Sequence, residues 1–332
     1  MNYLRNSVLA TIAYHDCLDY PLTSFEVHKF LINPARVNKL NEGISEIKQS
    51  AIFSELETLV KLGVISKNGE YYFLNRRQSL VQDRLDKKKI SDKKWLRFLM
   101  YSRFLLITPY LKGMFGSGSM GMDNANLESD YDLLIIGKAG RLYTARLFLW
   151  LIASIMGVRR KPGQLIAPDK LCFNHFISDD NLKLQHESLY NAQTYINLKP
   201  IYVPENLFNA FFGSNIWLNN FVYNFRPQGE LLNRKLEINF LSKFFLTIGK
   251  FLEIVLDTSL GDWLELKTKT YQQKRISENP ITNEPGGRIV FTDKEIEFHP
   301  YSFEKIVLEK YKNNLDKLAV AVPFQEKDSG LN

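Results

Sequence analysis

Two aspartates separated by one residue, Asp130 and Asp132, have the spacing that points most directly to chemistry. Side chains alternate between the two faces of a β-strand, so both carboxylates would point to the same side. Like charges this close repel each other and are best tolerated around a cation. Because Mg²⁺ binds one or two carboxylates together with substrate phosphates, the pair predicts a magnesium site that receives a phosphorylated ligand.

A strand and a loop must position this pair. Residues 133–136 read L-L-I-I, a continuous apolar run that is typical of a strand buried on both faces. Upstream, residues 116–119 read G-S-G-S. This sequence predicts a flexible turn whose backbone N–H groups are available to phosphate.

The order of these residues, Gly-Ser followed by Asp-x-Asp at the start of an apolar strand, resembles the nucleotidyltransferase superfamily of the DNA polymerase β type. The resemblance implies that Gly116 and Ser117 hold a nucleoside triphosphate, with ATP as the expected one. It also implies that Asp130 and Asp132 bind Mg²⁺. A third carboxylate is expected from a later strand.

That third carboxylate is not evident, because Asn174 and His175 stand at the centre of the next predicted strand, 170–178. Three acids would hold two Mg²⁺ ions and supply the base that activates the attacking hydroxyl. Two acids leave one metal site, with His175 as a candidate base and Asn174 as a candidate nucleotide contact. A lone histidine in an apolar strand is more often a packing residue. Strand alternation puts these two residues on opposite faces, and the sequence leaves open which one faces the site.

A short basic run follows the helix predicted over 142–157 and precedes a Pro-Gly turn. Within it, Arg159, Arg160 and Lys161 are candidates to pair with a triphosphate or a nucleic-acid strand. Cations are also ordinary at the C-terminus of a helix, where the helix dipole favours them. Both interpretations stay open.

The first 76 residues have the element order of a winged-helix domain. Apolar spacing predicts a helix over 4–14, a capping-box pattern at Thr23 starts a second, and 43–62 predicts a third. Asn-Gly at 68–69 then predicts a hairpin. The stretch resembles winged-helix domains, many of which bind DNA while others make only protein contacts.

The charge of the third predicted helix decides between these two partners. A helix that reads DNA is expected to be rich in Arg and Lys. This segment instead carries several acids, namely Glu42, Glu46, Glu55 and Glu57. We therefore expect a structural or protein-binding role, with DNA as a less favoured partner.

The sequence as a whole predicts an α+β protein with several parts. A winged-helix-like domain (1–76) and a cationic connector helix (77–100) precede a nucleotidyltransferase core with a mixed β-sheet and helices (101–200). A mainly α-helical C-terminal region (201–332) would supply the acceptor pocket.

Length, charge and cysteine content limit the compartments and partners that we expect for this protein. The chain has 332 residues, a net charge of +7 and only two cysteines, which are too far apart in sequence for a disulfide framework. The longest apolar run, 147–158, is too short to span a bilayer. We expect a cytoplasmic protein with no membrane partner, whose mild basicity is compatible with nucleotide or RNA.

The leading hypothesis is a Mg²⁺-dependent enzyme that transfers a nucleoside monophosphate from a nucleoside triphosphate to a hydroxyl group. The acceptor is unidentified and could be a small molecule, a protein or an RNA. The alternative is a nucleotide-sensing or catalytically weakened regulator that acts through the winged-helix domain. The missing third acid supports the alternative, whereas the two aspartates and the Gly-Ser loop argue against complete loss of metal binding.

Overall fold

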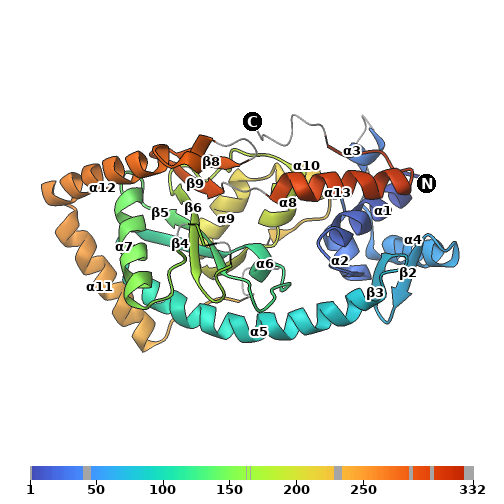
Figure 1. Ribbon diagram of the computed structural model, residues 1–332, viewed down its shortest axis with the longest axis horizontal. Coiled ribbons are helices and arrows are strands. Elements are labelled where there is room, and N and C mark those ends of the chain that lie inside the picture. Colours follow the sequence, from blue (N-terminus) through green and yellow to red (C-terminus); the bar gives the residue numbers. More distant parts are fainter. Residues whose placement is uncertain are drawn as a thin grey trace.

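The computed structural model shows a mixed α+β protein, as expected, with one three-stranded and one six-stranded sheet (Figure 1). The part of the chain that it describes comprises residues 2–39, 46–161, 163–164, 166–227, 234–283, 287–299 and 303–324.

The N-terminal unit, residues 2–39 and 46–74, packs helices on the small sheet. The predicted capping box is present, because the Thr23 hydroxyl accepts from the Glu26 N–H and the Glu26 carboxylate accepts from the Thr23 N–H. The predicted hairpin is also confirmed, with Gly69 at φ +61° in its turn. The elements are α1 (Asn2–Asp16), β1 (Leu22–Thr23), α2 (Ser24–Lys29), α3 (Pro34–Asn38), α4 (Gln49–Lys61), β2 (Ile65–Asn68) and β3 (Tyr71–Leu74).

Two details of this unit differ from the sequence prediction. The short helix α3 was not expected; Asn33 caps it with its side chain, and Pro34 stands at its first position. The third predicted helix was expected to begin at Gly43, which lies outside the described residues, and α4 begins at Gln49.

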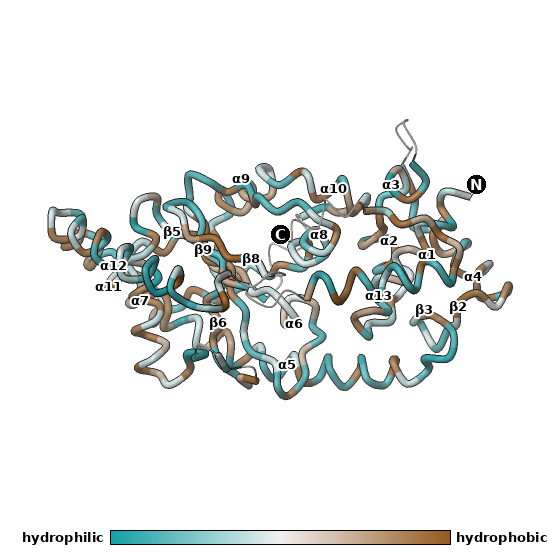
Figure 2. The backbone as a smooth tube through the Cα atoms, turned by 45° about the horizontal axis from the view of Figure 1, so that its top comes forward, coloured by the Kyte–Doolittle hydropathy of each residue, from teal (hydrophilic) through white to brown (hydrophobic). Residues whose placement is uncertain are grey.

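The connector helix α5 (Ser79–Leu105) runs from the N-terminal unit to the six-stranded sheet (Figure 1). Its 27 residues span about 40 Å at the rise of an α-helix. Figure 2 shows that much of its length is hydrophilic, in agreement with the predicted solvated connector. Its second half packs on the sheet through the buried side chains of Trp95 and Phe98, and its first half contacts the N-terminal unit, where Leu80 is buried and Arg84 pairs with Glu26.

The central sheet has the strand order β7-β4-β5-β6-β9-β8. Neighbours are antiparallel except β5 and β6, which are parallel and joined by helix α7 (Leu142–Ile155). Both faces of β5 are covered, as its apolar run predicts, because its side chains alternate between two core clusters. The strands are β4 (Leu111–Gly116), β5 (Tyr131–Gly137), β6 (Leu171–Ser178), β7 (Lys199–Tyr202), β8 (Arg288–Phe291) and β9 (Glu295–His299).

Helices cover the two faces of this sheet. On the face of Leu134 and Ile136 lie helices that follow β6, and on the opposite face lie α5, α7 and the pair α11 and α12. Between β4 and β5 the chain forms the single turn α6 (Gly118–Gly121). The remaining helices are α8 (Leu189–Tyr195), α9 (Glu205–Ser214), α10 (Leu218–Phe221), α11 (Phe240–Leu256), α12 (Ser259–Ser277), η2 (Pro280–Asn283) and α13 (Phe303–Lys317).

The C-terminal region is not only helical. Strands β8 and β9 join the central sheet, where β9 pairs with β6. Helix α8 begins at Leu189, and a few residues after its end the chain forms β7, whose Pro200 has no N–H to give to a ladder. The helices of this region include α11, which is followed after two residues by α12.

The N-terminal unit shares its hydrophobic core with the rest of the chain. Helix α13 packs on α1, with the rings of Tyr14 and Tyr311 edge to face at 5.4 Å. A β-bridge also joins Ile32 to Val222. One cluster of buried side chains therefore crosses the domain boundary predicted at residue 76. No helix among the described residues is long and apolar enough to cross a bilayer.

Candidate active site

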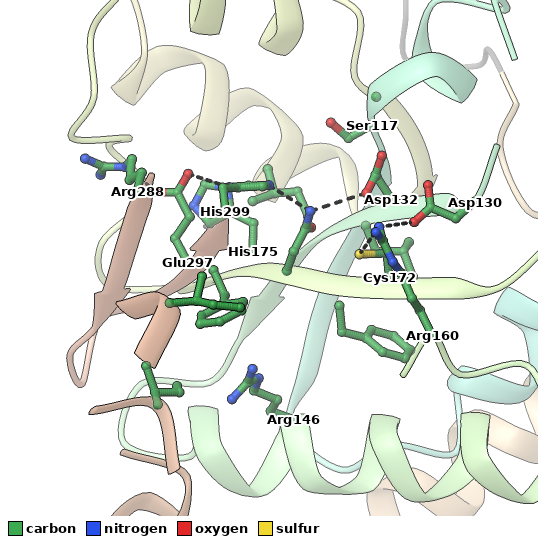
Figure 3. A pocket seen from close by; sticks show the side chains of 18 of the residues that line it. Ser117, Asp130, Asp132, Arg146, Arg160, Cys172, His175, Arg288, Glu297 and His299 are labelled. Carbon is green, nitrogen blue, oxygen red and sulfur yellow. Dashed lines mark hydrogen bonds and ion pairs between the residues drawn. The ribbon is translucent and has the colours of Figure 1, made fainter. Parts of the chain in front are cut away.

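A cavity of about 1010 Å³ opens beside β5 and β6 (Figure 3). Its wall combines the start of α6, the loop at 159–164, α8, the end of α12 and strand β9. Segments that are far apart in sequence therefore meet around one space. Its volume is at the upper end of the range for ligand pockets, enough for a nucleotide and a second small molecule.

Asp130 and Asp132 both line this cavity, whereas Tyr131 points to the opposite face and stacks on Phe98 with ring centroids 4.7 Å apart. This is the alternation that the sequence predicted. Removal from water, and then the charge of Asp130, raises the pKa of Asp132 to about 6. The pair is therefore a place where negative charge is crowded and a cation would be favourable.

The Gly-Ser loop approaches Asp132 with its backbone. The Ser117 N–H donates to the Asp132 carbonyl at 3.0 Å. Gly118 has φ +60°, and a β-carbon there would overlap the Asp132 carboxylate. Both residues line the cavity. Gly116 lies within β4, where a β-carbon would come 2.7 Å from Trp95, and it does not line the cavity. Packing therefore explains glycine at 116, and carboxylate contact explains it at 118.

Arg160 lies directly against the aspartate pair. Its Nη1 is 2.6 Å from Oδ2 of Asp130 and 3.6 Å from the sulfur of Cys172. Ligand atoms of Asp130, Asp132 and Cys172 all lie within 4.8 Å of one another. Burial, together with the two aspartates, raises the pKa of the Cys172 thiol, so this thiol stays protonated at neutral pH. The two carboxylates are thus the charged donors of the group, and they match the oxygen ligands that Mg²⁺ prefers.

Of the other basic residues in this loop, Arg159 and Lys161 also line the cavity. The Arg159 guanidinium lies 5.5 Å from the ring centre of Trp150 rather than against the aspartates. Within the described part of the chain, neither residue forms an ion pair with a carboxylate. Their positions keep both open to an anionic ligand.

A β-bulge in β6 decides how Asn174 and His175 face the site. Asp132 pairs with Cys172 and Leu134 pairs with His175, so β6 has one extra residue at this point. A bulge breaks the alternation of side chains. As a result both Asn174 and His175 line the cavity, and Nδ2 of Asn174 lies 3.3 Å from Oδ1 of Asp132.

His175 is buried and makes its polar contacts away from the aspartates. Its Nε2 lies 3.3 Å from Oε1 of Glu295, and its Nδ1 lies 3.5 Å from the Tyr195 hydroxyl. Ligand atoms of His175, Glu295 and Glu297 come within 4.8 Å of one another. The Arg288 guanidinium contacts both glutamates and supplies the positive charge of this group.

Sequence reasoning missed Glu297 and His299, which β9 brings to the site (Figure 3). Nδ1 of His299 donates to Oε1 of Glu297 at 3.0 Å, and the Asn174 amide donates to Nε2 of His299 at 2.7 Å. A hydrogen-bonded chain thus leads from Asp132 through Asn174 and His299 to Glu297. The signal was present, because E-I-E-F-H repeats polar residues at the period of two that revealed the aspartates.

The charged groups along this hydrogen-bonded path stabilise one another's ionised forms. Although burial lowers the pKa of His299, the hydrogen bond that its Nδ1 donates to Glu297 raises it overall. Burial likewise opposes ionisation of Glu297, but His175, His299 and Arg288 hold the pKa of this carboxyl well below its usual range. Glu297 is therefore a fixed anion that orients His299.

Taken together, the cavity offers two carboxylates to a cation and several cationic side chains to an anion. No protein-family model, curated protein or solved structure matches this chain. Its function is therefore argued from the site.

Proposed function

We propose that this protein is a Mg²⁺-dependent nucleotidyltransferase that moves a nucleoside monophosphate from a nucleoside triphosphate, with ATP as the expected donor, to a hydroxyl of an acceptor. The observation that carries the proposal is the placement of Asp130 and Asp132 on one cavity wall, against the turn of Ser117 and Gly118. The resemblance in sequence to the polymerase β-type superfamily rests on these same residues.

The donor set fits one Mg²⁺ ion. Asp130 and Asp132 would hold it, and its charge would offset the burial and the repulsion from Asp130 that raise the pKa of Asp132 to about 6. When bound, the ion would neutralise charge on the transferring phosphoryl group. Arg160, which already contacts Asp130, would face the same phosphates.

Several side chains of the cavity have roles in this reaction. The acceptor oxygen forms a bond to the α-phosphorus, the bond to pyrophosphate breaks, and the hydroxyl proton passes to a base. His299 is better placed for that base than His175, because Glu297 orients it and its Nε2 faces the Asp132 side of the cavity through Asn174. An acceptor hydroxyl that displaces the Asn174 amide would donate to the same nitrogen.

A regulator that senses a nucleotide is the second candidate. Helix α13 favours it, because Glu304 lines the cavity while the same helix packs on α1 of the winged-helix-like N-terminal unit. Ligand binding would then be communicated to a surface that contacts protein or, less favoured, DNA.

Pyrophosphate release separates the two candidates. The full chain is incubated with Mg²⁺ and each of the four ribonucleoside triphosphates, with and without a small-molecule extract, protein or RNA. We expect release that needs Mg²⁺, is lost in Asp132→Asn, and persists in Asp83→Asn, which removes an exposed acid on α5. Triphosphate binding without release, unchanged in Asp132→Asn, would contradict the enzyme and favour the sensor.

A further inference from the structure

Arg146 is a buried cation that has no carboxylate partner among the described residues. Its residue is 5% exposed, and its Nη1 donates to Oε1 of Gln272 at 2.9 Å. Its Nε has no hydrogen-bond partner among the described residues. Burying a charge without an opposite charge is unfavourable. Arg146 nevertheless lines the cavity, and Figure 3 shows it extending from α7 into that space.

Two further arginines share the same aromatic ring. The guanidinium carbons of Arg146, Arg159 and Arg275 lie 4.2, 5.5 and 6.0 Å from the ring centre of Trp150. In the described part of the chain none of the three forms an ion pair with an acid. Glu278, an acid that also lines the cavity, lies 3.7 Å from Lys274 instead.

These charges repel one another. Burial, and then the charge of Arg275, lowers the pKa of Arg146 to about 9, which still leaves it protonated at neutral pH. Attraction to the Trp150 ring offsets only part of this repulsion. The cluster is thus electrostatically incomplete without an anion.

Arg288 shows what a structural arginine looks like in the same cavity. It is held between Glu295 and Glu297, and its charge is matched within the protein. Arg146 lacks any such arrangement. The contrast between the two favours a ligand as the missing partner of Arg146.

The cluster is separated from the aspartate pair by β6. Arg146 lies over the ring of Phe176, which belongs to the core on the α7 face of the sheet, whereas Asp132 meets Asn174 on the other side (Figure 3). An anion bound by the arginines is therefore a different group from the phosphates that approach Asp132.

We propose that Arg146, Arg159 and Arg275 form a subsite for a phosphate monoester carried by a small-molecule acceptor. The assignment to an acceptor rests on the proposed function, whereas the phosphate site itself does not. Guanidinium groups match phosphate geometry, and three of them suit a dianion better than a carboxylate with one charge. The cavity of about 1010 Å³ has room for this acceptor beside the nucleotide.

Inorganic phosphate without Mg²⁺ tests the subsite. Its binding to the full chain is measured by calorimetry and by thermal denaturation, with chloride at equal ionic strength as the reference. We expect saturable binding that Arg146→Met weakens at least tenfold, and a rise in melting temperature that this variant loses. Arg97→Met removes an exposed cation that does not line the cavity, so this variant should bind phosphate as the wild type does.

Stability distinguishes a binding role from a structural one. Because Arg146 is buried without an opposite charge, Arg146→Met should melt at the same or a higher temperature when phosphate is absent. Equal phosphate affinity in Arg146→Met, an equal loss in Arg97→Met, or the same effect from chloride would overturn the subsite.

Two further measurements identify the source of the phosphate. Pyrophosphate release with a small-molecule extract should fall at least tenfold after the extract is treated with phosphatase, and inorganic phosphate should bind together with a non-hydrolysable triphosphate analogue. Release that survives phosphatase, or competition between phosphate and the analogue, would overturn the acceptor assignment. If phosphate binds but no extract stimulates release, the proposed enzyme and its acceptor fail while the phosphate site stands.

Discussion

At the scale of single residues, the raised pKa of Asp132 reflects burial and negative charge that a bound cation would offset. Its pKa in the folded protein, about 6, lies above its ordinary value of 3.8. Folding therefore favours the protonated carboxyl, and the contribution of this group to stability is lost as pH rises from about 4 to about 6. Asparagine mimics the protonated form and escapes this loss.

Without metal, the Asp132→Asn variant should thus become more stable relative to the wild type as pH rises through this window. The difference in unfolding free energy should approach about 3 kcal/mol as the pH rises above 6 and stay constant at still higher pH. Urea denaturation from pH 4 to 8 in a chelator measures it, with Asp83→Asn as the exposed control. Saturating Mg²⁺ should reverse the order of the two proteins. A difference that does not vary with pH would show that Asp132 is not strained.

His299 and Glu297 make a prediction about the pH dependence of the reaction. A base must be deprotonated, so kcat/KM should fall on the acid side of the His299 pKa. Glu297→Gln removes the hydrogen bond that raises this pKa, and the acid limb should move to lower pH while the rate falls. His299→Gln should lose about 100-fold or more.

Glu295→Gln is the matched control for that experiment, because Glu295 contacts His175 and Arg288 rather than His299. Its acid limb should stay in place. If instead Glu295→Gln moves the limb and Glu297→Gln leaves it, His175 rather than His299 is the titrating group.

The aspartates were predictable from the sequence because one strand holds both, and alternation alone puts them together. The partner of Asn174 was not, because His299 reaches it from a strand more than a hundred residues later. The role of Gly118 also stayed hidden, since a contact between its backbone and Asp132 leaves no trace in spacing.

At the scale of elements, the turn between β4 and α6 sets the distance from backbone to carboxylate. Gly118→Ala should displace the Asp132 side chain and lower Mg²⁺-dependent activity at least tenfold, because the new methyl group occupies the place of the carboxylate. Activity assays and melting temperatures of the same preparations measure the two effects separately.

Gly140→Ala is the control for backbone strain. Gly140 has φ +70° and open space around it, whereas Gly118 at φ +60° faces Asp132. Both variants should lose about 1 kcal/mol of stability because alanine is strained in the left-handed backbone conformation. Only Gly118→Ala should also lose activity. Equal activity in the two variants would mean that Asp132 tolerates the methyl group.

Elements with strong local signals were predicted correctly, including the capping box at Thr23, the Asn-Gly hairpin and the apolar strand β5. The missed strands share weak signals. β7 is four residues long and contains Pro200, β8 also has only four residues, and β9 has five residues of which three are polar. Their places in the sheet depend on pairing with β4 and β6, which sequence periodicity does not report. The bulge in β6 is likewise a property of pairing.

At the scale of the whole molecule, the contact between α1 and α13 makes the N-terminal unit and the central sheet one cooperative structure. All four tryptophans, at positions 95, 150, 217 and 263, lie outside the N-terminal unit. Their fluorescence therefore reports unfolding of the central sheet and its helices, whereas circular dichroism reports unfolding of all helices. We expect the two signals to unfold together in urea.

Tyr311→Ala tests this coupling. The ring is fully buried against Tyr14, so its loss should cost about 3–5 kcal/mol and shift both unfolding signals together. Tyr311→Phe keeps the ring and removes a hydroxyl that has no partner among the described residues, so it should be neutral or stabilising. Two separate transitions would show that the N-terminal unit folds on its own.

The packing of α13 on α1 also has a consequence during synthesis on the ribosome. Tyr14 emerges long before Tyr311, and at about 5–20 residues per second the delay between them is about 15–60 s. Throughout that time the side of α1 that packs on α13 stays exposed, and β6 has not yet paired with β9. The segment that leaves the ribosome first is therefore among the last to be completed.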